Sequence, residues 1–358
     1  MDTSNSYELP PFWTPHPACL HPAADVLEQH SLRWMTQLDF FGEPGRRKTM
    51  TAARSGLLAA YLTPGAPVDR VQLYADLICW LHCFDDCHVD DPQWEPSRLA
   101  DLARRTGTLV RALQNPGTPL RVDDPFVAAL VELSERFRSA ATPAQHKRWR
   151  EAFAPYFSAH LWLLSHHVNH TRPTLDEYLA LRTVASGTHL VAYTHEIVNG
   201  SEIAVHEWAL PPLWACVEIA YAVGNFDNDI VSRAKEVQDN ETGHNLVDIV
   251  AAEQNLPLSE ALRAAMAMRD RMLARFLAQY RLVRPLVSPS AARCLDDWAA
   301  LPAGALEMQR RSPRYAVNGH TGIRYTDTPS DTSIEPLPYS SVAWWWETLD
   351  NSPSGSGL

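Results

Sequence analysis

From about residue 70 to residue 310, apolar side chains recur at intervals of three and four residues. This spacing places them on one face of an α-helix, and the helix-favouring residues alanine, leucine and arginine dominate the same stretch. Sustained alternation of apolar and polar residues, which would indicate strands, is hard to find. Prolines separate the helical runs, as at Leu210–Pro212 and Arg172–Pro173. The pattern predicts an all-α protein with one helical domain.

The two ends of the chain differ from this helical middle. Residues 1–20 are expected to form an irregular N-terminal arm, and residues 21–316 the helical domain. Residues 317–358 are rich in Thr, Ser, Pro, Asp and Gly, a composition too polar to bury a core, so we expect a largely disordered tail. The cluster Trp344–Trp346 is the exception and is suited to docking on the domain.

Charge and cysteine usage narrow the class of protein. The 358 residues include 42 acidic and 31 basic ones, giving a formal net charge of -11, and no basic patch of a nucleic-acid binder is visible. An acidic chain can still bind an anionic substrate if metal ions lie between the two. The six cysteines lack CxxC spacing, and neither a signal peptide nor a membrane span is evident. A cytoplasmic protein without nucleic-acid or membrane partners is expected.

A first group of carboxylates closes an apolar helical stretch that begins at Val71. It comprises Asp85, Asp86, Asp90 and Asp91. Helical geometry places one stripe of residues on a common face: Val71, Tyr74, Ile78, Leu81 and Asp85. Clustered carboxylates repel one another, which favours a hard cation such as Mg²⁺. Taken alone, the group fits a solvated acidic helix end equally well.

A second group of oxygen donors lies in the stretch that begins with Pro211–Pro212. Asn228, Ser232 and Glu236 share one helical face and offer an amide, a hydroxyl and a carboxylate oxygen, while Lys235 can reach an anion on a bound metal. The same face continues toward the N-terminus through Gly224, Tyr221, Val217 and Trp214. Two helices that pass from an apolar to a metal-binding end suggest two walls of one pocket. The alternative for this helix alone is an ordinary amphipathic helix.

Two further clusters of potential ligands are interpreted as structural. His166, His167 and His170 lack cysteine or carboxylate partners at ligand spacing, so we expect a surface patch. Cys79, Cys83 and Cys87 follow one helical face, and we expect buried packing.

These motifs together resemble those of the bacterial class I terpene synthases. Asp85–Asp90 resembles the aspartate-rich DDxxxD motif, and Asn228–Glu236 fills every specified position of the NDxxSxxKE metal triad. Arg182 stands 46 residues before Asn228, where this family carries a diphosphate-sensing arginine, and Arg314–Tyr315 begins 86 residues after it, where the family carries an Arg-Tyr pair. The resemblance runs from about residue 10 to residue 315. It implies the family's helical bundle around a central apolar cavity.

The sequence departs from the family pattern at three places. Met308 stands where the family often has a cavity-lining tryptophan. Ser186–Gly187 fits the helix break at which a backbone carbonyl points at the substrate, but Ala185 replaces the polar linker common before it. A second pair, Arg324–Tyr325, follows the first, although the spacing favours Arg314–Tyr315.

The resemblance implies Mg²⁺-dependent ionisation and cyclisation of a linear isoprenyl diphosphate, farnesyl diphosphate in the first place and geranylgeranyl diphosphate in the second. Three Mg²⁺ ions are expected, with Asp85, Asp86, Asp90, Asn228, Ser232 and Glu236 as ligands. The residues expected to act on the diphosphate and at the helix break are Arg182, Ser186, Lys235, Arg314 and Tyr315. The expected substrate pocket comprises Tyr74, Ile78, Phe84, Gly187, Trp214, Val217, Tyr221, Gly224 and Met308. A homodimer is compatible with the resemblance.

Two other functions stay open at this point. A chain-elongating prenyltransferase shares the helical fold but uses two DDxxD motifs, whereas the second motif here is an Asn/Ser/Glu triad, which favours cyclisation. A non-catalytic helical protein that binds Mg²⁺ or Ca²⁺ would have no reason to carry Arg182 and Arg314 at these spacings.

Overall fold

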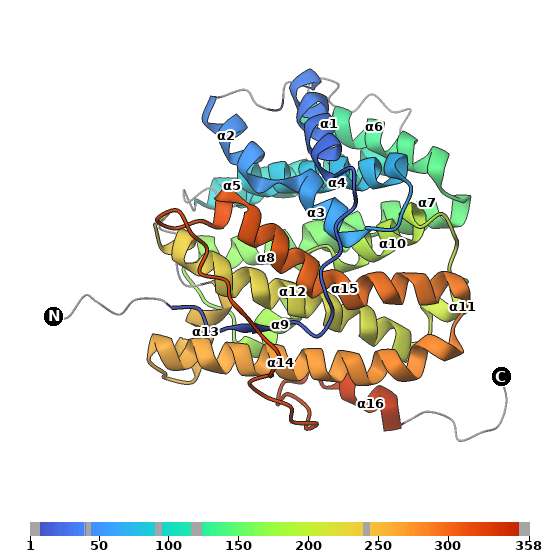
Figure 1. Ribbon diagram of the computed structural model, residues 1–358. Coiled ribbons are helices and arrows are strands. Elements are labelled where there is room, and N and C mark those ends of the chain that lie inside the picture. Colours follow the sequence, from blue (N-terminus) through green and yellow to red (C-terminus); the bar gives the residue numbers. More distant parts are fainter. Residues whose placement is uncertain are drawn as a thin grey trace.

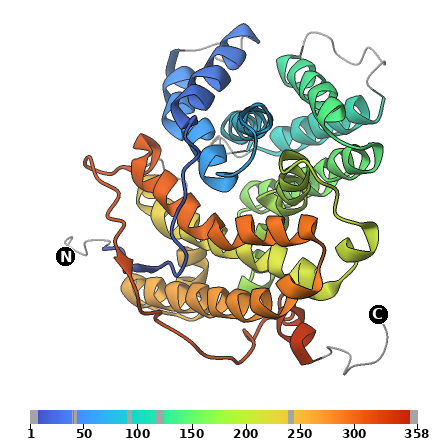
Figure 2. The same cartoon turned by 45° about the vertical axis from the view of Figure 1, so that its right-hand side comes forward.

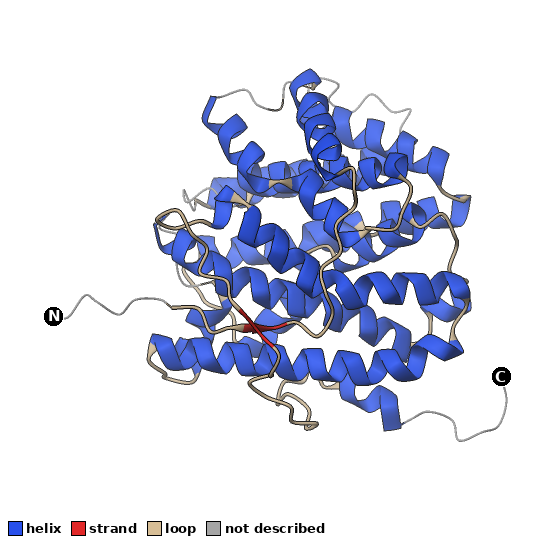
Figure 3. Ribbon diagram, viewed as in Figure 1, coloured by secondary structure: helices blue, strands red, loops and turns tan. Residues whose placement is uncertain are grey.

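The structure is a computed structural model that describes residues 8–38, 40, 44–89, 95–115, 124–238 and 244–350. Helices form nearly all of its regular secondary structure (Figures 1 and 3). The sheet found in these ranges joins two strands of two residues each. No helix within them is long and apolar enough to cross a bilayer. The predicted all-α class is confirmed.

The helices differ widely in length, from four residues in α11 to 28 in α12. The α-helices are α1 (Ala24–Gln37), α2 (Pro44–Ala53), α3 (Ser55–Leu62), α4 (Val68–His88), α5 (Pro96–Gln114), α6 (Pro125–Ala140), α7 (Pro143–Glu151), α8 (Phe153–Val168), α9 (Leu175–Ala185), α10 (Thr188–Val198), α11 (Val205–Trp208), α12 (Pro211–Gln238), α13 (Leu246–Glu253), α14 (Leu258–Val283), α15 (Pro289–Arg311) and α16 (Trp344–Asp350). The remaining elements are β1 (Phe12–Trp13), β2 (Tyr325–Thr326) and the 3₁₀ turns η1 (Arg284–Leu286) and η2 (Pro313–Tyr315).

Two long helices organise the bundle. Helix α12 packs against α14, α15, α13 and α9, and helix α4 packs against α3, α1, α6 and α10. In Figure 2 the blue and cyan N-terminal helices lie in the upper half, and the yellow and orange helices α12, α14 and α15 lie in the lower half. The two helices that carry the sequence motifs therefore belong to opposite halves of the bundle.

Helix α4 is buried on two sides because it lies between two hydrophobic clusters. Tyr74 and Ile78 belong to the cluster that α12, α14 and α15 dominate. Leu77, Trp80 and Phe84 belong to a second cluster, which α5, α6, α7 and α8 complete. This double burial explains why nearly every residue from Val71 to Phe84 is apolar, with no solvated face.

Local sequence signals fix a sharp break between α9 and α10. Thr174 and Glu177 form a capping box that starts α9. Helix α9 ends at Ala185, and Gly187 then adopts a left-handed conformation with φ of +71° before α10 begins. Glycine takes this conformation without the steric cost of a Cβ atom. The break places Ser186 beside the cavity described below.

The N-terminal arm and the C-terminal tail meet in the small sheet. Phe12–Trp13 of β1 pairs in parallel with Tyr325–Thr326 of β2, and Phe12 is fully buried (red in Figure 3). Residues 8–20 contain no helix. The arm also contacts the domain directly, because Arg269 of α14 donates a hydrogen bond to the main-chain oxygen of Trp13 at 2.6 Å.

The expectation of a largely disordered tail is corrected for residues 317–347, which the structure describes as an ordered segment anchored on the domain at several points. Trp345 is fully buried; its carbonyl accepts hydrogen bonds from Arg275, and its indole donates to Glu218 at 2.9 Å. Leu337 and Val342 are buried beside it. A few apolar anchors outweigh the polar composition of the segment, because each buries a large area. Residues 351–358 lie outside the described ranges.

Candidate active site

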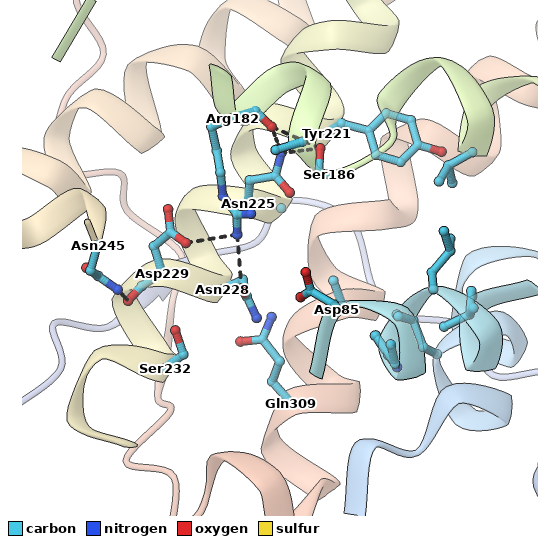
Figure 4. A pocket seen from close by; sticks show the side chains of 18 of the residues that line it. Asp85, Arg182, Ser186, Tyr221, Asn225, Asn228, Asp229, Ser232, Asn245 and Gln309 are labelled. Carbon is cyan, nitrogen blue, oxygen red and sulfur yellow. Dashed lines mark hydrogen bonds and ion pairs between the residues drawn. The ribbon is translucent and has the colours of Figure 1, made fainter. Parts of the chain in front are cut away.

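A cavity of about 390 Å³ lies between α4 and α12, a size typical of small-molecule sites. Residues of α3, α8, α9, α10 and α15, of turn η2 and of the segment before α13 complete its lining. Its apolar side chains are Leu58, Leu62, Ile78, Leu81, Leu163, Leu181, Val191, Leu301 and Met308. Polar side chains from α9 and α12 gather at the other end, around Arg182 and Asn228 (Figure 4). We call the two parts the apolar end and the polar end.

Helix α4 contributes Tyr74, Ile78 and Asp85 to the lining. Phe84 does not line the cavity; its ring stacks on Trp80 in the second hydrophobic cluster, with ring centroids 5.2 Å apart. One residue is about 100° around a helix, so Phe84 faces away from the stripe that holds Asp85. The predicted place of Phe84 in the substrate pocket is corrected accordingly.

Asp86, the next aspartate of the first motif, is not among the residues that line the cavity. Asp86 accepts two hydrogen bonds from the Arg314 guanidinium, at 2.9 and 2.6 Å. Asp90 lies outside the described residues.

Helix α12 contributes most of the polar end. Its lining residues from the predicted set are Tyr221, Gly224, Asn228, Ser232, Lys235 and Glu236. The Ser232 hydroxyl donates to Glu236 Oε1, and Asn245 Nδ2 donates to Oε2 at 2.9 Å. Burial raises the pKa of the Glu236 carboxyl to about 7. A cation bound beside this carboxyl would favour its charged form.

Two predicted pocket residues of α12 lie beyond the cavity. Val217 is fully buried in the core, and the Trp214 ring lies 5.6 Å from the Trp208 ring while its indole donates to Glu218. Both lie on the stripe of Tyr221 but one and two turns further toward the N-terminus. Tyr221 is the first residue of α12 that lines the cavity, so the predicted places of Val217 and Trp214 in the pocket are corrected.

Arg182 of α9 is held at the polar end by α12. Its Nη2 atom lies 2.9 Å from Asp229 Oδ1 and 3.2 Å from Asn228 Oδ1, and Tyr178 donates to the second Asp229 oxygen (Figure 4). Burial works to lower the pKa of Arg182, but Asp229 and the other acidic groups around it (Tyr178, Asp85 and Glu236) together outweigh burial, and the pKa is raised. The arginine is therefore a permanent positive charge beside the predicted metal triad.

Turn η2 brings Arg314 and Tyr315 to the same end of the cavity. The Tyr315 hydroxyl accepts a hydrogen bond from Asn228 Nδ2 at 3.1 Å, while Arg314 is paired with Asp86. These two contacts connect the motif helices α4 and α12. Arg324 of the second pair lies elsewhere: its side chain is 57% exposed and bonds to the N-terminal arm.

The break after α9 is held by a residue that the sequence analysis did not single out. Ser186 lines the cavity and accepts a hydrogen bond from Asn225 Nδ2 at 2.8 Å (Figure 4). Gly187 does not line it; a Cβ added there would lie 3.4 Å from the Tyr156 ring, so this predicted pocket residue is corrected too. Asn225 precedes Asn228 by three residues on the same helical face, which is the signal that would have identified it.

Histidines also enter the lining without a signal in the sequence. Burial lowers the pKa of His82 to about 4 and that of His160 to about 3, so both are neutral at pH 7. His167 and His244 line the cavity with ring centroids 3.8 Å apart. The surface patch expected around His167 is therefore corrected for this residue, whose pKa burial lowers to about 3.

The oxygen donors fit a hard divalent cation. Asp85 from α4 and Asn228, Ser232 and Glu236 from α12 line one cavity, and carboxylate, amide and hydroxyl oxygens are the ligands that Mg²⁺ takes. Within the described ranges no three His, Cys, Asp or Glu side chains form a cluster suited to a metal. A cation here would therefore also need the amide and hydroxyl oxygens of the triad.

The helical bundle, the apolar cavity and the oxygen donors with arginines at one end define a class of enzyme that acts on isoprenyl diphosphates. The model of terpene synthase family 2, described as C-terminal metal binding, matches residues 76–275, and the chain belongs to this family. The protein is a terpene synthase, a lyase acting on isoprenyl diphosphates, and the family resemblance found in the sequence is confirmed.

Similar proteins span nearly the whole chain. Bonnadiene synthase of Allokutzneria albata is 30% identical, over 96% of this chain and 99% of its own length. The 4-epi-cubebol synthase of Streptosporangium roseum, named as cyclising (2E,6E)-farnesyl diphosphate, is 26% identical over 86% of this chain and 92% of its own length. The crystal structure of the SVS_A2 protein from ancestral sequence reconstruction superposes with a TM-score of 0.85 at 28% identity, covering 96% of this chain and 99% of that one.

Proposed function

We propose that the protein is a Mg²⁺-dependent cyclase that converts a linear isoprenyl diphosphate into a cyclic terpene and releases diphosphate. Farnesyl diphosphate is the proposed substrate in the first place and geranylgeranyl diphosphate in the second. The observation that carries the proposal is the meeting of both motif helices at the polar end of one apolar cavity. The farnesyl-cyclising relative from Streptosporangium roseum supports the C15 substrate.

Three Mg²⁺ ions are proposed at the polar end, with Asp85, Asp86 and Asp90 as ligands from the first motif and Asn228, Ser232 and Glu236 from the second. When bound, Mg²⁺ supplies Lewis-acid stabilisation of the charge that develops on the diphosphate. The contacts among Ser232, Glu236 and Asn245 hold these donors side by side before any ligand arrives.

Four side chains are proposed to bind the diphosphate and orient it. They are Arg182, Lys235, Arg314 and Tyr315, which all line the polar end. When the bond between the allylic carbon and oxygen breaks, the electron pair leaves with the diphosphate, and these fixed donors stabilise the leaving group. Arg182 is suited to this role because its guanidinium stays charged although it is buried.

The carbocation left behind is proposed to react in the apolar end. Leu81, Leu181 and Leu301 exclude water that would quench it, and the rings of Tyr74 and Tyr221 line the same space. An aromatic face stabilises a cation by about 0.5 to 2 kcal/mol. Met308 lines the cavity without an aromatic ring, so this support is proposed to come from tyrosines in the lining, Tyr74 and Tyr221 among them.

Product analysis tests the proposed function directly. The purified protein with Mg²⁺ is incubated separately with geranyl, farnesyl and geranylgeranyl diphosphate, and products are identified by gas chromatography with mass spectrometry. We expect cyclic products with equimolar diphosphate release. Longer diphosphates, formed only when isopentenyl diphosphate is added, would indicate a prenyltransferase instead, and no turnover of any substrate would contradict catalysis.

A variant of Arg182 connects this activity to the cavity. Arg182→Met removes the charge beside the triad and is expected to abolish turnover while the circular dichroism spectrum stays native. Arg104→Met is the matched control, because that side chain is 62% exposed and lies on α5. Near-normal turnover of Arg182→Met would remove this residue from the proposed site.

A further inference from the structure

Asn225 lines the cavity but belongs to none of the groups assigned above. It lies on α12 three residues before Asn228, on the face that carries the metal triad. Its amide nitrogen lies 2.8 Å from Ser186 Oγ and 3.4 Å from the main-chain oxygen of Arg182. Asn225 therefore joins α12 to the break between α9 and α10 (Figure 4).

The hydrogen bonds fix which way the Asn225 amide points. The Arg182 carbonyl oxygen can only accept, so the amide NH₂ group must face it. The Ser186 hydroxyl donates to the same carbonyl at 3.1 Å and can accept from Asn225 through a lone pair. With NH₂ held toward the break, the carbonyl oxygen of the Asn225 side chain is directed away from it, toward the cavity (Figure 4).

The height of Asn225 along α12 places this oxygen below the diphosphate. At a rise of 1.5 Å per residue, Asn225 lies about 4.5 Å from Asn228 toward the apolar end. A substrate whose diphosphate lies at the triad has its first carbons at that level. At the break itself, Ala185 ends α9 and lines the cavity with only a methyl group, so its side chain offers no polar atom.

We propose that the side-chain carbonyl of Asn225 stabilises the allylic cation as it forms, and that Ser186 and the Arg182 main chain orient it for this role. The inference rests on the proposed function. The negative end of an amide dipole that is already aimed at a developing positive charge stabilises the transition state without reorganisation. The water-excluding side chains around it keep this interaction strong.

The Arg182 contacts also couple Asn225 to diphosphate recognition. The guanidinium of Arg182 bonds to Asn228 at the triad, and its main-chain oxygen accepts from Asn225. One residue thus connects the group that receives the leaving diphosphate with the group that faces the cation. The negative diphosphate would then face the Arg182 guanidinium, and the positive allylic carbon would face the Asn225 side-chain oxygen.

Three variants test the proposal. Asn225→Leu keeps the size and removes the carbonyl, and Asn225→Asp keeps an oxygen toward the cavity but cannot donate to the break. Thr183→Val is the matched control, because the Thr183 hydroxyl donates to a main-chain oxygen of α9, that of Ala180, and Thr183 is not among the cavity residues. The measurements are turnover by diphosphate release, the ratio of cyclic to acyclic products, and the thermal stabilisation by Mg²⁺ with inorganic diphosphate.

We expect Asn225→Leu to lower turnover by about tenfold or more and to raise the share of acyclic products, because an electrostatic contact to the transition state is lost. The thermal stabilisation by Mg²⁺ and diphosphate should stay as in the wild type, and Thr183→Val should keep the wild-type turnover. Asn225→Asp should lose less turnover than Asn225→Leu because it retains an oxygen, but it should not reach the wild-type rate because it cannot donate to the break. Wild-type behaviour of Asn225→Leu, or equal losses in the Leu and Asp variants, would overturn the proposal. No terpene from the wild type would overturn the proposed function itself.

Discussion

Replacing Arg314 by alanine separates the two Arg-Tyr pairs of this chain. The Arg314 side chain is 16% exposed and paired with Asp86, and it lines the cavity at its polar end. Arg324 is 57% exposed, and its partner Glu8 is 74% exposed. Removing one electrostatic contact to a transition state costs on the order of 3 kcal/mol, or about a hundredfold in rate. Exposed ion pairs contribute only about 0 to 1 kcal/mol to stability, so Arg324→Ala should leave turnover unchanged.

The assay follows diphosphate release at saturating substrate and Mg²⁺ for both alanine variants and for Arg314→Lys. We expect Arg314→Ala to lose about a hundredfold in kcat, and Arg314→Lys to recover part of it, because lysine keeps the charge but loses the two-pronged geometry toward a phosphate. Circular dichroism of each variant controls for folding. A larger loss in Arg324→Ala than in Arg314→Ala would refute the reasoning and move the functional pair to the second position.

Three further predictions concern the metal, the cavity and pH. EDTA should abolish turnover and excess Mg²⁺ should restore it; full activity in chelator contradicts the metal sites. Glu236→Gln should yield little of any product. Gly224→Leu should change the product mixture at measurable rates, because a Cβ at this position would lie 3.0 Å from Leu301. An unchanged mixture by gas chromatography would contradict the prediction for Gly224. Burial lowers the pKa of His195 to about 3, below its unfolded value of about 6.5. The contribution of this residue to the free energy of unfolding is therefore fully present above pH 6.5 and is lost as the pH falls, by roughly 2 kcal/mol at pH 5. The free energy of unfolding in urea should depend less on pH in His195→Gln than in His206→Gln, the control at an exposed site. An equal pH dependence of the two variants would contradict this prediction.

The helical class could be predicted because apolar spacing reports helix formation directly. The family could be predicted because four motifs stand at fixed separations, and the structure brings Arg182, Asn228 and Arg314 to one cavity although they are far apart in the chain. Sequence spacing carries this information when each motif lies on a continuous helix, as here on α9 and α12.

Periodicity gives the face of a helix but neither its neighbours nor the depth of a cavity. Phe84 and Trp214 were expected in the pocket as aromatic residues suited to stabilising a cation, and Trp214 also because it follows the helical face of Tyr221. Helix α4 is buried on both sides, so Phe84 packs into the second cluster, and Trp214 lies beyond the end of the cavity at Tyr221. Both errors arise from tertiary packing, because the residue pattern of one helix does not show which other helices pack against it.

The tail and the histidines mark a second limit of sequence analysis. Composition averages over a segment, so the polar residues around Trp345 concealed an anchor that is fully buried. His160 of α8 and His244, which lies just before α13, both line the cavity. Their positions in the sequence have no regular spacing from the motifs. Such residues become visible only when the fold brings separate elements together.

The charges at the polar end explain how an acidic chain is suited to binding an anion. Arg314 is paired with Asp86 and Arg182 with Asp229, so each arginine is already neutralised by a carboxylate. On the proposed function, a cation that binds Asp86 would free Arg314 to bind an anion, whereas Arg182 keeps its partner Asp229. On the proposed function, divalent metal and diphosphate each raise the affinity for the other, since linkage between two ligands is reciprocal. On this proposal the acidic residues make diphosphate binding depend on the metal, so that the substrate ionises only in the complete complex.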